Sequence, residues 1–472
     1  MLAVHLRIND SATKKPTPVR LAISGPNGEY YPPLGRLAGF ACGVGEDVGG
    51  NLRVGRENFS YIDGSCEVRL PAGVPLRIRA TKGPEFTPID ESIVLGSGQM
   101  AVRLEIQRWS NLSENGWMGG DGRAHFLSPH AALLESSAED VAVTNLLAKA
   151  HHHLTNDGNT SLAIPNLLEF GGQSPTLETP WQIVAVNTLN VHRSLGSLAL
   201  LHSHRPVYPL AFGEPYDTDD WSLFDWSNQC HRKNGLVVWT NAFQQEGGEA
   251  LAAAILGKID AVEFAAGPRT PPLLPWYYRL LNAGVRLPLV GASGKDSNRI
   301  ALGSLRTYAN VGDESRTYAS WIEAVRDGKT FITNGPLLSF EIGETILAEA
   351  ESAAPFVKLE IVVDGLPFAT ATPVESSVRF TAKIELPIPE NANWIAARCI
   401  GGPSPLYPDA VQFAHSSPVS LGPIRRDAES VNALLSQLER LREWATERAN
   451  FTDEKWRAQL LSNCDLAAAR LT

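Results

Sequence analysis

Hydrophobic and polar residues alternate in short runs over residues 1–112, and Gly and Pro separate the runs. Examples are CEVRLP at 66–71, PLRIRA at 75–80 and AVRLEI at 101–106. Such alternation is typical of strands that bury one face. The pattern predicts a small antiparallel β-sandwich at the start of the chain.

From Trp117 onwards the pattern changes, because continuous apolar runs alternate with segments of helical periodicity. Strands are expected at 141–148, 181–186, 198–201, 236–241, 259–264 and 287–294. Helices are expected at 128–139, 219–233, 249–256, 275–284 and 317–326. This alternation indicates parallel α/β units, and their number favours a (β/α) barrel over residues 113–338 rather than an open sheet. Ligands would then meet the C-terminal ends of the strands.

The pattern returns to alternating strands after Pro336 and predicts a second β-sandwich over residues 339–424. The remaining segment, 425–472, has an apolar stripe at helical spacing, made by Val431, Leu434, Leu435, Leu438 and Leu441. It is expected to form an amphipathic helical tail that packs on the rest of the chain.

Composition narrows the classes of function. The formal charge of −10 argues against nucleic acid as a partner, since that would need clustered Lys and Arg. Five scattered cysteines without C-x-x-C spacing indicate free thiols in a reducing compartment. Neither a signal peptide nor a membrane span is recognisable, so a soluble cytoplasmic protein is expected. The oligomeric state cannot be inferred from the sequence.

Five motifs follow one another in an order that resembles a known family. They are GWMGGDGRAHFLSPHAALLE at 116–135, NGLVVWTN at 234–241, WYYRLLNAGVRLPLVGASGKDSN at 276–298, LGSLRTYA at 302–309 and SWIEAVRDGKTFITNGPLL at 320–338. The chain resembles, over nearly its whole length, the bacterial-type CehA/McbA branch of the PHP (polymerase and histidinol phosphatase) metallohydrolases. The resemblance implies a PHP-like barrel and hydrolase ancestry; the name-giving members cleave carbaryl.

The family's metal-ligand positions are largely substituted in this chain. The G-D-x-H-x-H motif reads Gly120-Asp121-Gly122-Arg123-Ala124-His125, so one His is kept and the other is Arg. The other aligned ligand positions hold Leu189, Ser197, Asn241 and Gly294. Only His125 is an ordinary metal ligand, and a cationic Arg123 opposes a dication. The resemblance therefore implies a pseudoenzyme whose family metal site is lost.

A displaced metal site is the alternative. His192, His202 and His204 lie in the same strand-end regions as the lost ligands, and Asp296 is two residues from Gly294. A site drawn from them, with His125, His192 and Asp296 as its first candidates, could hold Zn, Mn or Fe. The run from His151 to His153 is a weaker candidate, because adjacent residues point in different directions. A polar loop or capping role is favoured for that run.

The substitutions also predict a cationic barrel mouth. Its candidate ligand-binding residues are Arg123, His192, His204, Arg205, Asn241, Lys295 and Asp296. Such a lining suits a carboxylate, phosphate or sulfate, and the loop 293–297 could add backbone N–H donors. The structural alternative is that Arg123 forms an ion pair with Asp121 or Asp296.

Two hypotheses follow for function. The favoured one is a non-catalytic protein that binds a small anionic molecule or partner at the mouth. The other is an active metal-dependent hydrolase of an ester, amide, carbamate or phosphoester, with His125 and Asp121 as catalytic acid–base groups.

Overall fold

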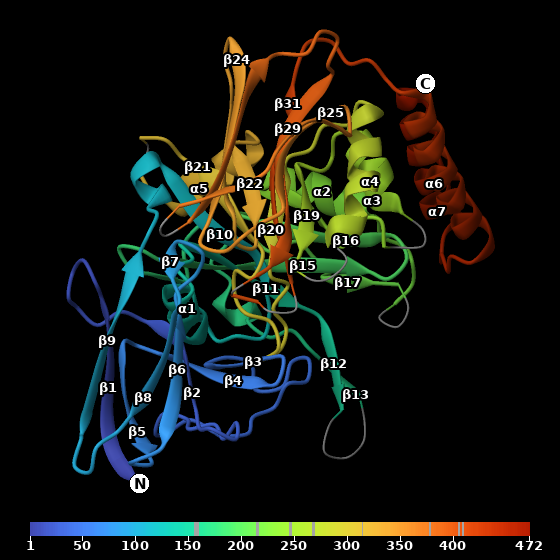
Figure 1. Ribbon diagram of the computed structural model, residues 1–472. Helices are drawn as coiled ribbons and strands as arrows, with labels where there is room; N and C mark the ends of the chain where they lie inside the picture. Colours follow the sequence, from blue (N-terminus) through green and yellow to red (C-terminus); the bar gives the residue numbers. More distant parts are fainter. Residues whose placement is uncertain are drawn as a thin grey trace.

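Strands dominate the fold in the computed structural model, which describes residues 1–154, 160–213, 217–244, 248–266, 270–313, 315–376, 379–404, 406–407 and 410–472. Strands make up 39% of the chain and helices 20%, so this is a mainly β protein (Figure 1).

Two sheets form the N-terminal part and share one hydrophobic core. The first has the order β5(Ser65–Leu70)-β1(Leu2–Asp10)-β9(Ala101–Arg108)-β7(Phe86–Thr87). The second has the order β3(Asn51–Val54)-β4(Glu57–Ile62)-β2(Val19–Ser24)-β6(Pro75–Thr81)-β8(Ile89–Val94). Val4 and Leu6 of β1 are buried against Leu21 and Ile78 of the second sheet. The alternating sequence thus buries one face of each strand.

The central part is one large mixed sheet that continues into the C-terminal strands. Its order begins β20(Leu289–Ala292)-β19(Ala261–Ala265)-β18(Leu236–Thr240)-β16(Gly196–Leu201)-β15(Ile183–His192)-β11(Val143–Lys149)-β10(Trp117–Ala124)-β21(Arg306–Asn310)-β22(Thr330–Thr333). The short strands β14(Leu177–Glu178) and β17(Ala211–Phe212) also pair with β15, and β12(His151–Leu154) and β13(Thr160–Ala163) form a separate pair. Two 3₁₀ turns, η1(Leu112–Asn115) and η2(Leu167–Glu169), complete this part.

The predicted α/β barrel is wrong. Although β10, β11 and β15 are parallel, β16 runs antiparallel to both β15 and β18, and β21 runs antiparallel to β10 and β22. Within the described residues the order ends at β20 on one side, so no closed barrel forms. The error has a physical cause: strands buried on both faces are continuously apolar in a mixed sheet as well as in a parallel one.

The predicted helices of the central part are confirmed. They are α1(Pro129–Ala138), α2(Leu223–Arg232), α3(Glu249–Ile255), α4(Thr270–Asn282) and α5(Tyr318–Arg326). Ser128 caps α1, since its hydroxyl accepts a hydrogen bond from the N–H of Ala131, and Pro129 occupies the first turn. Helix α1 contacts β2 and β4 on one side and β11 and β15 on the other, so it lies between the N-terminal sheets and the central sheet.

The C-terminal strands form two sheets, one of which continues the central sheet. One of these sheets is separate from the central sheet and has the order β23(Leu337–Ile342)-β24(Thr345–Ser352)-β28(Phe380–Pro387)-β27(Val374–Glu375). The other is the end of the central sheet, where β22 is followed by β30(Val411–Ser416)-β29(Trp394–Pro403)-β25(Lys358–Val363)-β26(Leu366–Ala371), with β31(Val419–Ser420) beside β29. The two sheets share a core that includes Ile346 and Ile361.

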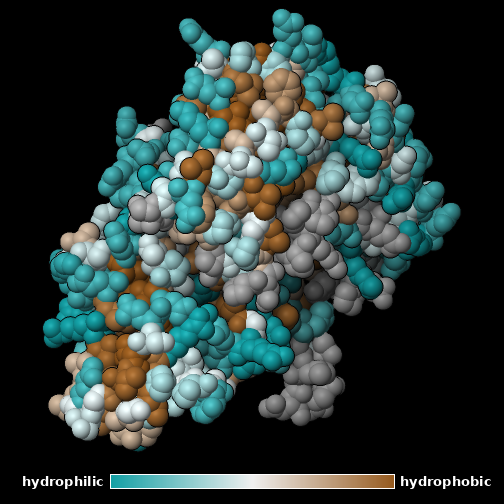
Figure 2. All heavy atoms as spheres, in the orientation of Figure 1, coloured by the Kyte–Doolittle hydropathy of each residue, from teal (hydrophilic) through white to brown (hydrophobic). Residues whose placement is uncertain are grey.

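The C-terminal tail forms two helices, α6(Ala428–Glu447) and α7(Glu454–Leu471), which pack on α3 and α4. Leu434, Leu438 and Leu441 are buried there, as the apolar stripe predicts. No helix among the described residues is long and apolar enough to span a membrane. Figure 2 shows hydrophilic side chains over much of one face, interrupted by apolar patches over the N-terminal and C-terminal strands.

Candidate functional site

Asp121 lies in β10 and is fully buried. Its Oδ1 accepts hydrogen bonds from the N–H groups of Arg123 (3.0 Å) and Ser293 (2.9 Å), and its Oδ2 accepts one from Gly303 (2.8 Å). Burial raises the pKa of Asp121, although these hydrogen bonds oppose the rise. Because both oxygens accept hydrogen bonds from backbone N–H groups, Asp121 ties β10 to two neighbouring loops.

Arg123 forms an ion pair with a residue that the sequence analysis did not select. Its Nε and Nη2 donate to the two carboxylate oxygens of Glu263 in β19, each at 2.8 Å. Burial would lower the pKa of Arg123, but the carboxylates of Glu263, Asp121 and Asp296 together outweigh it, with Glu263 first, and the pKa is raised. The expected partners were Asp121 and Asp296, so the structural alternative named the right kind of interaction but the wrong carboxylate.

Gly294 lies directly against this guanidinium. A Cβ atom at Gly294 would be 3.2 Å from Nη2 of Arg123, and the residue has a φ of +64° that favours glycine. Two aligned metal-ligand positions, 123 and 294, therefore adjoin in space.

His125 is buried beside Arg123 and is uncharged at neutral pH. Its Nδ1 lies 3.0 Å from the carbonyl oxygen of Leu147, so this nitrogen carries the proton, and Nε2 lies 3.4 Å from Nη1 of Arg123. Burial lowers the pKa of His125 well below its ordinary value, and the charges of Arg123 and Lys149 lower it further. Nε2 is thus the acceptor of the hydrogen bond from Arg123.

Lys149, at the end of β11, completes the group. It is partly buried, and no carboxylate of the described residues lies within 4.0 Å of its ammonium. Burial lowers the pKa of Lys149, the charge of Arg123 lowers it further, and Asp296 opposes both. We refer to Arg123, His125, Lys149, Glu263 and Asp296 as the strand-end cluster.

Lys295 does not line an open mouth, in contrast to the prediction. It is fully buried, and its ammonium donates to the carbonyl oxygens of Ile300 (2.9 Å) and Ser297 (3.3 Å) and pairs with Glu135 (3.3 Å). Three N–H groups of the same loop are also used internally, because Ser293 donates to Asp121, Gly294 to the Arg123 carbonyl and Lys295 to the Ser293 hydroxyl. These three groups are not free to bind an anion.

His192, at the end of β15, is linked through Asp219 to the segment between α6 and α7. Its Nδ1 accepts hydrogen bonds from the N–H groups of Ser194 and Leu195, and its Nε2 donates to Asp219 at 2.7 Å. Asp219 in turn accepts a 2.6 Å hydrogen bond from the N–H of Asn450, between α6 and α7. Both ring nitrogens of His192 are thus engaged within the protein.

The remaining candidates contact other parts of the chain. His204 and Arg205 are exposed on the loop after β16, and the Nδ1 of His204 lies 3.2 Å from the carbonyl oxygen of Lys233. Asn241, with a φ of +49°, lies 3.4 Å from the hydroxyl of Ser197. The structure thus brings Asn241 to Ser197, another aligned ligand position.

The displaced metal site does not assemble. Among the described residues, no three His, Cys, Asp or Glu side chains come together in a way that could hold a metal ion, so His125, His192 and Asp296 do not meet. In the run from His151 to His153, His151 packs edge-on against Phe126, and the side chain of His153 lies outside the described residues.

Sequence reasoning missed Glu263 and Lys149, although both leave a signal. Glu263 is the one charged residue inside the apolar run AVEFA, and Lys149 is the one charged residue at the end of VTNLLAK. A charge in a buried strand requires a partner, and a charge at a strand end lies where ligands bind.

Comparison with known proteins gives little. No family model matches the chain, and no curated protein matches it. A solved structure, PsfC from Pseudomonas syringae PB-5123, is similar at 14% identity and a TM-score of 0.31, over 46% of this chain and 90% of that one. A similarity this low carries no argument about fold or function.

Proposed function

We propose that the strand-end cluster binds a small anion, a carboxylate or a phosphate, at the ammonium of Lys149. The observation that carries this proposal is that Lys149 is partly buried and has no ion pair with a described carboxylate. A cation held in such a place gains a charge-assisted hydrogen bond when an anion arrives. Glu263 already compensates Arg123, which therefore contributes orientation rather than net charge.

We also propose that the chain descends from the CehA/McbA-type PHP hydrolases, on the strength of its motifs. The adjacency of positions 123, 125 and 294 supports the alignment. At such a place an Arg–Glu pair replaces ligands for a dication, and neutral His125 accepts a hydrogen bond from the same arginine. Binding without metal-dependent hydrolysis is the function that this set of side chains favours.

Thermal denaturation with a panel of anions tests the proposal. Phosphate, sulfate, acetate and benzoate are compared with chloride at one ionic strength, for the wild type, Lys149→Met and the control Lys329→Met, whose lysine is exposed. At least one anion should raise the midpoint of the wild type and of the control, but not of Lys149→Met. Equal shifts in all three proteins, or none in any, would contradict it.

Metal content separates this proposal from the hydrolase alternative. Elemental mass spectrometry on protein purified without added metal or a His-tag should find less than one equivalent of Zn, Mn or Fe. A stoichiometric metal that is lost in His125→Ala would instead favour catalysis.

We propose a cytoplasmic location, because all five cysteines are free thiols and three of them, Cys230, Cys399 and Cys464, are buried. Fractionation of cells that express the natural chain, with thiol alkylation before lysis, tests this. Oxidised cysteines in a non-cytoplasmic fraction would contradict it.

A further inference from the structure

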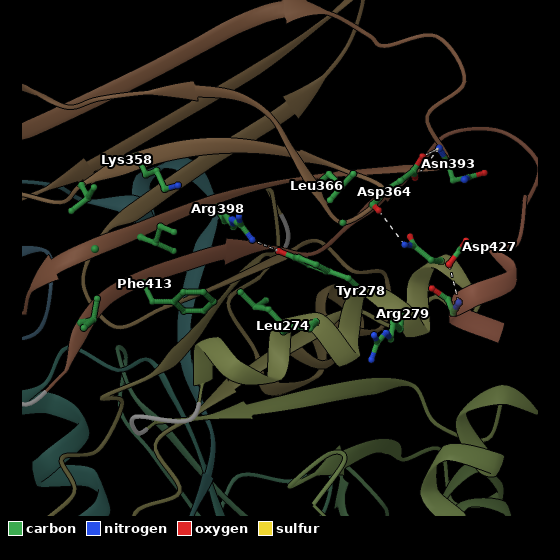
Figure 3. A pocket seen from close by; sticks show the side chains of 18 of the residues that line it. Leu274, Tyr278, Arg279, Lys358, Asp364, Leu366, Asn393, Arg398, Phe413 and Asp427 are labelled. Atoms are coloured by element: carbon green, nitrogen blue, oxygen red, sulfur yellow. Dashed lines mark hydrogen bonds between the residues drawn. The ribbon is translucent and has the colours of Figure 1, made fainter. Parts of the chain in front are cut away.

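A cavity of about 980 Å³ lies between α4 and the strands that the C-terminal part of the chain adds to the central sheet. It shares no lining residue with the strand-end cluster. Its walls come from α4, from β25, β26, β29 and β30, and from the start of α6 (Figure 3). Sites for small organic molecules typically have volumes of roughly 300–1,000 Å³. We refer to this space as the α4 cavity.

The pairing of β25 with β29 places three charged side chains on the sheet face that looks toward α4. Glu360 lies opposite Arg398, and Lys358 is two residues from Glu360 on the same face. One carboxylate oxygen of Glu360 lies 2.6 Å from the Lys358 ammonium, and the other accepts a 2.6 Å hydrogen bond from Nε of Arg398. One buried carboxylate thus holds two cations, which leaves one positive charge in excess.

Tyr278 of α4 orients the guanidinium of Arg398 from the opposite wall. Nδ1 of His415 lies 2.7 Å from the carbonyl oxygen of Ser416, so it carries the proton and Nε2 is the acceptor. The Tyr278 hydroxyl therefore donates to Nε2 of His415 (2.8 Å) and accepts from Nη1 of Arg398 (3.1 Å). Nε and Nη1 of Arg398 are then used, whereas Nη2 has no hydrogen-bond partner among the described residues, and Arg398 lines the cavity.

The opposite end of the cavity carries carboxylates that are already engaged. Asp364 accepts hydrogen bonds from the N–H groups of Asn393 and Trp394, both at 3.0 Å, and Asp427 caps α6 through the N–H of Ser430 at 2.8 Å. Figure 3 shows Lys358 and Arg398 at one end, Asp364 and Asp427 at the other, and Tyr278 between them. Arg279 also lines this second end, where its guanidinium lies 3.6 Å from Glu429, so the cations without a carboxylate of their own are Lys358 and Arg398, which share Glu360.

Apolar side chains line the space around these cations. Leu274 and Phe413 are buried, whereas Val357, Leu366 and Val411 are 58%, 72% and 58% exposed. Three large exposed apolar residues around one cavity are unusual on a soluble surface unless something covers them.

We propose that the α4 cavity binds a monomeric amphiphilic monocarboxylate. Its carboxylate would accept hydrogen bonds from Lys358 and Arg398, and its alkyl or aryl body would lie along Leu274, Phe413 and Leu366. This inference is independent of the function proposed for the strand-end cluster, because the two sites share no residue.

Isothermal titration with octanoate and decanoate, below their micelle concentrations, tests the proposal on the full chain. Decanoate should bind more tightly than octanoate, and 1-octanol should bind at least tenfold more weakly than octanoate, since it lacks the charge. Lys358→Met should weaken octanoate binding about tenfold. The control Lys383→Met, an exposed strand lysine on β28, should leave it unchanged.

A second pair of variants keeps the test independent of folding. Leu366→Ser, at an exposed residue, should weaken decanoate binding several-fold, whereas Val374→Ser, an equally exposed residue outside the cavity, should not. The proposal is overturned if octanoate does not bind, if octanol binds as tightly, or if Lys358→Met binds like the wild type. Binding to phosphatidylglycerol vesicles without binding to monomeric octanoate would also overturn it.

Discussion

The strand-end cluster and the α4 cavity both place cations beside buried carboxylates, but they differ in how the cations share those carboxylates. In the cluster, Glu263 holds one cation, Arg123, with two hydrogen bonds, and no carboxylate of the described residues lies within 4.0 Å of the Lys149 ammonium. In the cavity, Glu360 divides its two oxygens between Lys358 and Arg398. Sequence motifs led to the first region, whereas no motif indicated the second.

The difference teaches that the ligand chemistry of a site depends on the donors that remain after internal pairing, not on the number of charged residues. Lys295 illustrates this point, because its ammonium pairs with Glu135 and donates hydrogen bonds to two carbonyl groups inside the protein. Variants in the strand-end cluster and in the α4 cavity can test this comparison.

Glu263→Gln should have the largest effect. It removes the charge that compensates buried Arg123, so the free energy of unfolding should fall by about 3–5 kcal/mol. Chemical denaturation measures this loss, and Glu385→Gln, at an exposed residue of β28, should change stability by less than about 0.5 kcal/mol. Equal effects of the two variants would show that the Arg123–Glu263 pair does not hold the cluster together.

Acidification should lower the stability of the folded chain through His415, the hydrogen-bond partner of Tyr278 in the wall of the α4 cavity. Burial lowers its pKa to about 4, and a free histidine has a pKa of about 6.5. The unfolded chain then binds more protons between pH 6.5 and 4, so stability is present above this window and should be lost as pH falls through it, by about 3 kcal/mol. Denaturation at several pH values measures the slope, which should be shallower in His415→Gln. An unchanged slope in that variant would assign the acid sensitivity to other groups, such as His125.

Tyr278→Phe should have a smaller effect on stability. The variant leaves Nε2 of His415 and Nη1 of Arg398 without their common partner, which should cost about 1–3 kcal/mol. It should also weaken octanoate binding, because the guanidinium is no longer oriented. Tyr208→Phe, at an exposed tyrosine, is the control for both measurements. Weaker octanoate binding without any loss of stability would contradict the hydrogen-bond relay.

The smallest expected effect is a change in the reactivity of the Lys149 amine. Because burial and Arg123 lower the pKa of Lys149, its neutral amine should form at a lower pH than that of an unperturbed lysine. Amine-reactive labelling read by peptide mass spectrometry should show an onset for Lys149 below the pH of about 10.4 expected for free lysine. An onset at or above that pH would mean that Asp296 outweighs burial and Arg123.

Much of the local structure was predictable. Capping at Ser128, the stripe of Leu434, Leu438 and Leu441, and the apolar runs of β18 and β19 all depend on neighbouring residues, and they formed as expected. Strand direction was not predictable, because β16 is apolar whether it runs parallel or antiparallel to β15. That one ambiguity turned a mixed open sheet into an expected barrel.

The candidate site was predictable only in part. The motif selected Arg123 and His125, which the structure buries beside each other. Which carboxylate would pair with Arg123 depends on a contact between residues 140 positions apart, and that contact is set by the order of strands. The α4 cavity likewise joins a helix to four later strands, so it leaves no local pattern.

The most direct test of the account asks whether an anion occupies the space at Lys149. Amine labelling of Lys149 and of the exposed Lys329 is followed by peptide mass spectrometry, with and without the anion that most raises the thermal midpoint. The account predicts that this anion slows labelling of Lys149 about tenfold or more and leaves Lys329 unchanged. Labelling of Lys149 that no anion of the panel slows, in folded protein, would contradict it.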